Sequence, residues 1–275
     1  MAKKTEVAKT TEDPNAVPSY LKDYQDQHAD DGFGAEDITL PMVKLLQGTS
    51  EEITVHDNAK PGTFWHTGAD ENLGESIQFI PISRSKMYLL QTPMIDSQGV
   101  IARAMDAKTW DRTGSWEVKI DRKTTVTWTI DDLDVAASGL TAFGTSDPDD
   151  ENSPPAATLF YRYLVLIRGR EELGPCVLLL ARTMIKRARK GLNDKIAHHK
   201  SHGRPMQALV FEARAAEAQN DAGQDYNVMN FYSRGFATEE EFSICEAASE
   251  QFENYSFDEG HIDNNASSKA DSDKF

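Results

Sequence analysis

The chain is poor in cysteine and has no long apolar run. Only Cys176 and Cys245 occur among its 275 residues, too few for a disulfide framework. No stretch approaches the roughly 20 consecutive apolar residues that a membrane-spanning helix needs. Residues 1–6 also lack the apolar core of a secretory signal. We therefore expect a soluble protein of a reducing cytoplasm, with 39% apolar residues to form its core.

Familiar catalytic motifs are missing as well. The sequence contains no GxxxxGK(S/T) phosphate loop, no HExxH zinc motif and no nucleophile elbow. His198, His199 and His202 lack paired cysteines at a zinc-binding spacing, so we assign them a structural or phosphate-contacting role. The chain is therefore expected to be non-catalytic, with no cofactor and no bound metal.

One enzymatic alternative stays open. Glu117 and Lys119 form an E-x-K triplet, and Asp111 precedes it. In nucleases of that type carboxylates hold Mg²⁺ while a lysine stabilises the attacked phosphate. Such triplets are common in a chain with this many charges, so the pattern alone does not establish a metal-dependent nuclease.

Positive charge is scarce overall but concentrated in one segment. The chain has 45 acidic and 29 basic residues, which gives a net charge of −16. Residues 160–214 contain twelve Lys or Arg against four acids, whereas residues 215–275 contain fourteen acids against three basic residues. A solvated face is the simpler reading of a charge run, but this segregation favours a specific anionic partner.

The two ends of the chain read as unstructured. Residues 1–36 are polar and predict a flexible arm, and residues 254–275 are rich in Asp, Asn and Ser and predict a disordered acidic tail. An aromatic side chain beside the terminal carboxylate suits a pocket on another protein. The tail residues expected to bind a replication or transcription partner are Asp271, Asp273, Lys274 and Phe275.

Residues 37–253 predict one domain of the α+β class that is mainly β. Alternation of apolar and polar residues predicts strands at 77–90, 159–168, 176–182, 206–211 and 226–236. A helix at 184–199, with Ile185, Ala188, Leu192, Ile196 and His199 on its buried face, separates the third strand from the fourth. Thr238 and Glu241 form a capping box that begins a last helix.

The order of these elements is that of an OB-fold-like five-stranded barrel with a helix between strands three and four. Between the first two strands, residues 93–157 predict a long insertion with a strand at 124–130 followed by a loop rich in Asp and Pro.

Aromatic and basic residues interleave on the later strands and the helix. Aromatic rings stack on unpaired bases, and cations neutralise phosphates, so this pattern suits single-stranded DNA. The alternatives are that the rings fill the core, or that the basic residues 186–190 read a duplex groove. The expected DNA-binding residues are Tyr161, Arg162, Tyr163, Arg168, Arg182, Lys186, Arg187, Lys190, Tyr226, Tyr232, Arg234 and Phe236.

On these features the chain resembles the single-stranded DNA-binding proteins of phages, of the podovirus type. The resemblance rests on the strand order, the basic and aromatic block at 160–236, and the acidic tail ending in Phe275. It implies a role in phage DNA replication, recombination and late transcription, inside the host cytoplasm. A phage scaffold or transcription regulator that never touches DNA is the remaining rival, and the oligomeric state stays open.

Overall fold

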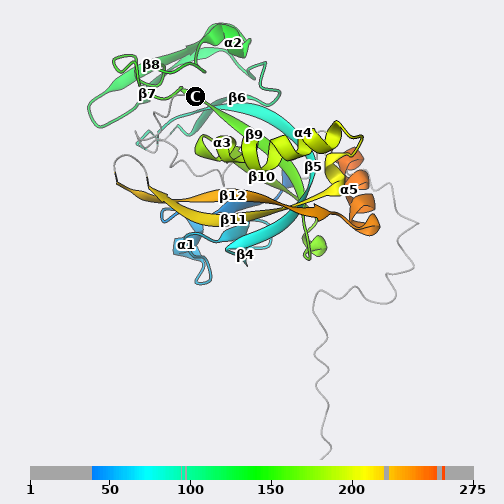
Figure 1. Ribbon diagram of the computed structural model, residues 1–275. Helices are drawn as coiled ribbons and strands as arrows, with labels where there is room; N and C mark the ends of the chain where they lie inside the picture. The colour runs from blue at the N-terminus through cyan, green and yellow to red at the C-terminus, as the bar shows by residue number, and fades with distance from the viewer. Residues whose placement is uncertain (1–38, 94, 97, 220–222, 253–255, 258–275) are drawn as a thin grey trace, which may run out of the picture.

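The computed structural model describes residues 39–93, 95–96, 98–219, 223–252 and 256–257 (Figure 1). The arm predicted at 1–36 lies outside the described residues, and so does the acidic tail except for the backbone of 256–257. The partner-binding role predicted for Asp271, Asp273, Lys274 and Phe275 therefore remains a prediction.

One large mixed sheet dominates the structure. Eight of its strands follow one another in the order β12-β11-β5-β9-β10-β2-β3-β4, and the ninth, β6, pairs with β5. These strands are β2 (Met42–Leu45), β3 (Phe64–His66), β4 (Glu71–Gly74), β5 (Ser76–Gln91), β6 (Val100–Ala104), β9 (Ala157–Ile167), β10 (Pro175–Ala181), β11 (Leu209–Gln219) and β12 (Asp225–Phe236). The strand β5 is central because its first half pairs with β11 and its second half with β6, while β9 runs along its other edge.

The sheet curls into a half-barrel around an inner core. Phe64 of β3 and Phe231 of β12 belong to one buried cluster, although these strands stand near opposite ends of the sheet order. The two ends also meet through hydrogen bonds, because the Gln47 side chain accepts from the Asn227 N–H at 2.9 Å and donates to its carbonyl at 3.0 Å.

A helical segment covers the inner core. It consists of α3 (Thr183–Ala188), the π-helical turn η4 (Arg189–Asn193) and α4 (Asp194–Lys200). Ile185, Ala188, Leu192 and Ile196 lie in the core, so the predicted helix and these four buried positions are confirmed. The fifth predicted position, His199, is only half-buried. In Figure 1 this segment lies along β12, with α3 beneath the lobe that residues between β5 and β9 form and α4 toward α5 (Glu239–Gln251).

The opposite face of the sheet packs against α5 (Glu239–Gln251). Cys245 and Ala248 of this helix lie in a second core with Ile80 and Leu164. The predicted capping box is present, since the Thr238 side chain accepts from the Glu241 N–H and Glu241 bonds back to the Thr238 N–H. Next to this core, β1 (Thr39–Leu40) pairs in parallel with β13 (Ser256–Phe257).

Residues between β5 and β9 form the upper lobe of Figure 1, which has its own core. A two-stranded hairpin of β7 (Gly114–Lys119) and β8 (Thr125–Ile130) pairs Trp116 with Trp128. The short helix α2 (Val135–Ser138) follows it. The remaining short helices of the described chain are α1 (Glu52–Val55), η3 (Glu171–Leu173) and η5 (Met206–Ala208).

The prediction of a mainly β, α+β fold is confirmed, and the sheet that carries it is a half-barrel of more than five strands. The five predicted strands do form a continuous array, β12-β11-β5-β9-β10, with the helix between β10 and β11. The sheet continues past β10, however, because β2 pairs in parallel with it at Val177↔Met42. The backbone N–H and C=O groups on the outer edge of β10, which would pair with another strand to close a five-stranded barrel, pair with β2 instead.

Candidate nucleic-acid interface

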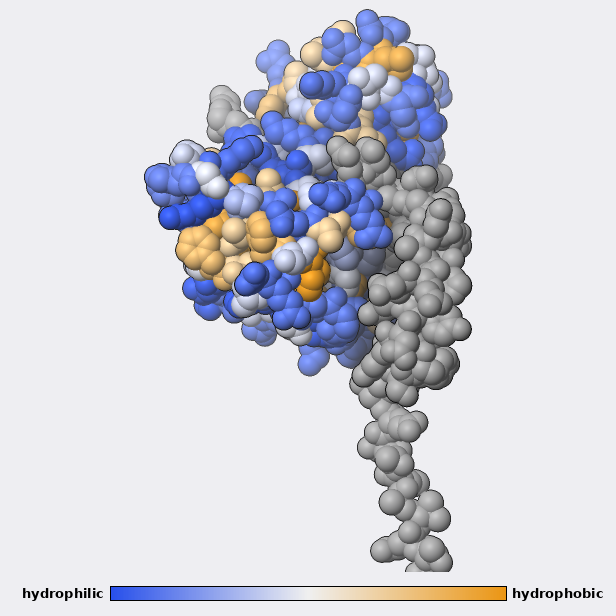
Figure 2. Space-filling model, turned by 90° about the vertical axis from the view of Figure 1, so that its right-hand side faces the viewer, coloured by the Kyte–Doolittle hydropathy of each residue, from blue (hydrophilic) through white to orange (hydrophobic). Residues whose placement is uncertain are grey.

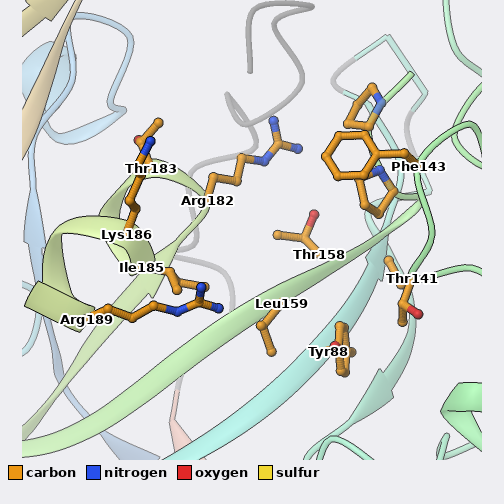
Figure 3. Close-up of a pocket in the computed structure, with 13 residues that line it drawn as sticks. Tyr88, Thr141, Phe143, Thr158, Leu159, Arg182, Thr183, Ile185, Lys186 and Arg189 are labelled. Atoms are coloured by element: carbon orange, nitrogen blue, oxygen red, sulfur yellow. The ribbon is translucent and has the colours of Figure 1, made fainter. Parts of the chain in front are cut away.

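A pocket of about 480 Å³ opens between α3 and the upper lobe. Its lining combines apolar and basic side chains, and the lining residues that the structure describes include no acidic one. The aromatic and basic side chains in its wall are Tyr88, Phe143, Arg182, Lys186 and Arg189. In Figure 3, Arg182 and Arg189 extend from the α3 side into the space that Phe143 faces. In a chain of net charge −16, a cavity whose described wall contains three cations and no carboxylate is a marked local exception.

The three cations share one side of the segment 182–189, which comprises the N-cap of α3, α3 itself and the first residue of η4, because of their spacing. Arg182, Lys186 and Arg189 lie at i, i+4 and i+7, which is the repeat of one helical face. The apolar side of the segment carries Ile185 and Ala188 into the inner core, and Ile185 also borders the pocket beside the cations. Packing of that apolar face therefore fixes the direction in which the cations point.

Arg182 begins the helix in a strained conformation. Its φ is +49° and its ψ is −121°, a region that residues with a Cβ rarely adopt. Strain of this kind often collects where a side chain must be held for binding.

Below the pocket, β5 and β9 add further cations and a ring. The register pairs Arg84 with Tyr163 and Lys86 with Tyr161, so these four side chains share one face of the sheet. The Arg84 guanidinium lies 4.3 Å from the centre of the Tyr161 ring, and the Lys86 ammonium lies 5.7 Å from it. The Arg189 Nε donates to the Tyr161 hydroxyl at 3.4 Å, which joins this group to the pocket wall.

The pKa values of Tyr161 and Tyr88 reflect the burial and the positive charge around them. Burial works to raise the pKa of Tyr161, but Arg189, Lys86 and Arg84 outweigh burial and hold that pKa below its ordinary value. Burial, with a smaller contribution from Tyr161, raises the pKa of Tyr88, so that ring stays neutral. A positive potential of this kind attracts an anionic ligand.

Several predicted residues do reach this region. Arg182 and Lys186 line the pocket, and Tyr161 lies under it with Arg84 over its ring. The Tyr161 ring is only 4% exposed, so it supports cations rather than presenting a face to a base.

Other predicted residues serve the fold. Tyr163 is fully buried and its hydroxyl donates to the Asn193 side chain, which corrects the expectation that it stacks on DNA. Burial also raises its pKa. On the opposite face of β9, the Arg162 Nε donates to the Ser85 hydroxyl at 2.8 Å.

The remaining predicted cations divide between ion pairing and the helix surface. Arg168 pairs with Glu241 of α5 at 2.7 Å, away from the pocket. Arg187 donates to the Asn230 side chain of β12, while Lys190 is exposed on η4.

The predicted residues of β12 form a separate group. Tyr226 is half-buried near the β11–β12 hairpin, whereas Tyr232 and Phe236 are 43% and 54% exposed. The Tyr232 ring lies between Arg214 and Arg234, at 5.5 and 5.6 Å from their guanidinium carbons. Both arginines also pair with Glu212, which offsets part of their charge.

The acidic residues of the nuclease alternative are not gathered into a cluster of metal ligands. Asp111 faces Arg103 and Arg112 at 3.8 and 3.6 Å, and Glu117 is exposed on β7. Within the described ranges, no group of three or more His, Cys, Asp or Glu side chains is arranged to hold a metal ion. Carboxylates neutralised by arginines are poor candidates for gripping Mg²⁺.

Sequence reasoning missed five residues of this region, namely Arg84, Lys86, Tyr88, Phe143 and Arg189. Three of them alternate along β5 at positions 84, 86 and 88, which is a signal of a shared strand face. Phe143 lies in a loop that carries no periodic pattern.

Comparison with known proteins places the chain in one family. The family model of Pam3 phage gp34-like proteins matches residues 8–258, so the chain belongs to that family and is a bacteriophage protein. No curated protein and no solved structure matches it. Over the part of the chain that the structure describes, no helix is both long and apolar enough to cross a membrane.

Proposed function

We propose that this phage protein binds single-stranded DNA largely regardless of sequence and acts without catalysis in phage DNA replication and recombination, with a further role in late transcription. The pocket between α3 and the upper lobe is the centre of the proposed site. Arg182, Lys186 and Arg189 contact phosphates, and Phe143 and Tyr88 offer ring surfaces to unpaired bases.

The observation that carries this proposal is the composition of the pocket wall. Rings from β5 and the upper lobe come together with cations of the segment 182–189, and no carboxylate lies among the described residues of the wall. An apolar ligand would not need three cations, and a simple anion would not need Phe143, which is 42% exposed. A nucleotide has both an aromatic face and a phosphate, and an unpaired strand presents both at every position.

The order of the central strands also supports the proposal. We propose that β5, β9, β10, β11 and β12 form an opened OB-like unit, with the helix α3–α4 in the place the OB-fold gives it. The residues between β5 and β9 then correspond to the first long loop of that fold, which contacts oligonucleotides in OB proteins. Phe143 lies in this segment and faces the pocket.

A salt titration with a matched control tests the proposal. Lys186→Glu reverses a charge in the pocket wall, whereas Lys123→Glu makes the same change at the tip of the β7–β8 hairpin. We expect wild type to bind single-stranded oligonucleotides more tightly than duplex, and Lys186→Glu to weaken binding and lower the slope of log affinity against log salt by about 0.7 per lost phosphate contact.

Lys123→Glu should leave both the affinity and the slope close to wild type. Equal effects of the two substitutions would show that only net charge matters and would contradict the proposed site. A wild-type protein that binds neither form of DNA would overturn the proposed function and favour the scaffold or regulator alternative.

A further inference from the structure

The helical segment 183–200 connects the pocket to a second aromatic position at its far end. Eighteen helical residues span about 27 Å at 1.5 Å per residue. The segment begins at the pocket wall, and near its end the His199 ring lies 5.5 Å from the Phe236 ring in an edge-on contact. The Arg204 guanidinium lies 5.6 Å from the same ring.

The solvent side of this segment is strongly basic. Its exposed charged residues are Lys186, Arg189, Lys190, Asp194, Lys195 and Lys200, of which only Asp194 is acidic. The exposed His198, in the last turn of α4, and the exposed His202, just after it, add ring nitrogens with ring centres 4.7 Å apart. The positive potential of the pocket therefore continues along the whole segment.

Phe236 is available for contact at the far end. Its side chain is 54% exposed, whereas a phenylalanine whose role is to fill the core is usually buried. Figure 2 views the side of the molecule on which α5 lies and shows apolar side chains gathered on the main body, bordered by hydrophilic ones. Phe236 and Ile244 are exposed apolar residues of elements on this side.

We propose that a single strand bound in the pocket continues along the segment 183–200 and ends with a base stacked on Phe236. The inference rests on the proposed function and adds the direction and length of the bound strand. Lysines along the helix contact successive phosphates, and Arg204 and His199 hold the Phe236 ring for stacking. A path of this length is crossed in roughly four to eight nucleotides, depending on how far the strand is extended.

The test measures how much affinity is gained when an oligothymidylate is lengthened from 4 to 12 nucleotides. Phe236→Ala should reduce this gain by roughly 5- to 100-fold, the range expected for loss of one stacked base. Phe236→Tyr keeps a ring and should retain the gain. Ile244→Ala is the matched control, because it removes an exposed apolar side chain of α5, an element that supplies no residue to the proposed path.

Thermal unfolding of each variant shows whether the fold is intact before the affinities are compared. An intact Phe236→Ala protein with the wild-type gain would overturn the path, and so would equal losses in Phe236→Ala and Ile244→Ala. These outcomes leave the proposed function standing provided that Lys186→Glu still weakens binding at both lengths. Absence of DNA binding in wild type would overturn both.

Discussion

Arg182 combines a backbone conformation that lowers the stability of the fold with a side chain that lines the proposed binding site. It caps α3 without a side-chain hydrogen bond to the helix, and its φ of +49° is unfavourable for any residue with a Cβ. Its side chain nevertheless lines the pocket beside two other cations. A glycine would adopt this backbone conformation without strain, so the arginine is retained at a cost in stability.

Replacing Arg182 separates these two effects. Arg182→Gly should raise the free energy of unfolding by about 1 kcal/mol relative to Arg182→Ala, because only the glycine relieves the positive φ. Both variants lose the cation, so both should bind single-stranded DNA more weakly than wild type and to a similar extent. Chemical denaturation measures the first quantity and fluorescence anisotropy the second; a glycine variant less stable than the alanine variant would disprove the strain.

The residues that sequence reasoning missed on β5 show why a strand face is hard to assign. Ile77 and Phe79 point into the inner core, and simple alternation would continue inward through positions 81, 83 and 85. The register shifts between Pro81 and Ser83, so positions 84, 86 and 88 take the inner face instead. Pro81 predicts a kink but not the direction of the shift, which depends on pairing with β9.

At the scale of elements, helix 183–200 depends on a close approach to β12. A Cβ built on Gly191 would lie 2.7 Å from the Phe231 carbonyl oxygen and 2.9 Å from the Phe231 Cβ. The π-helical turn 189–193 surrounds this glycine. A bulky residue at position 191 would therefore push the helix, and with it the pocket cations, away from the strand.

Gly191→Ala tests this packing because two known effects oppose each other. Helix propensity alone favours alanine by up to about 1 kcal/mol, whereas a clash with backbone atoms costs about 1–3 kcal/mol. We expect net destabilisation, measured as a lower denaturation midpoint with an unchanged slope. Ala197→Gly, at an exposed position of α4, is the comparison for propensity alone and should cost no more than about 1 kcal/mol. A stabilised Gly191→Ala protein would mean that the helix can move without penalty.

The elements with clear periodicity were predictable, and the short ones were not. The helix 183–200 and the capped helix α5 follow from apolar spacing and from Thr238 with Glu241. In contrast, all four residues of β2 are buried, including Lys44, which pairs with Glu52 at 2.9 Å. A short strand buried on both faces shows no alternation, so neither β2 nor its parallel pairing with β10 could be read from the sequence. For this reason the sequence predicted a barrel of five strands and did not predict that β2 extends the sheet beyond β10.

At the scale of the whole molecule, opposite charges occupy different segments of the chain. The helix 183–200 and β5 supply the cations near the pocket, while residues 258–275 contain five acids against two lysines. An acidic segment attached to the same chain is held at a high effective concentration, so it competes with DNA for a basic surface. We propose such competition in addition to a role of Asp271, Asp273, Lys274 and Phe275 in docking other proteins.

Removing residues 258–275 should therefore tighten binding to single-stranded DNA at low salt. The difference from wild type should shrink above about 0.3 M salt, because charges separated by more than a few ångströms are then screened. A full-length variant with the five tail acids changed to Asn or Gln separates charge from length, and it should bind as tightly as the truncated chain. Titrations at two salt concentrations decide the matter: equal affinities of wild type and both variants at low salt would reject competition. A neutral tail that binds like wild type beside a tighter truncated chain would instead assign the effect to the bulk of the tail.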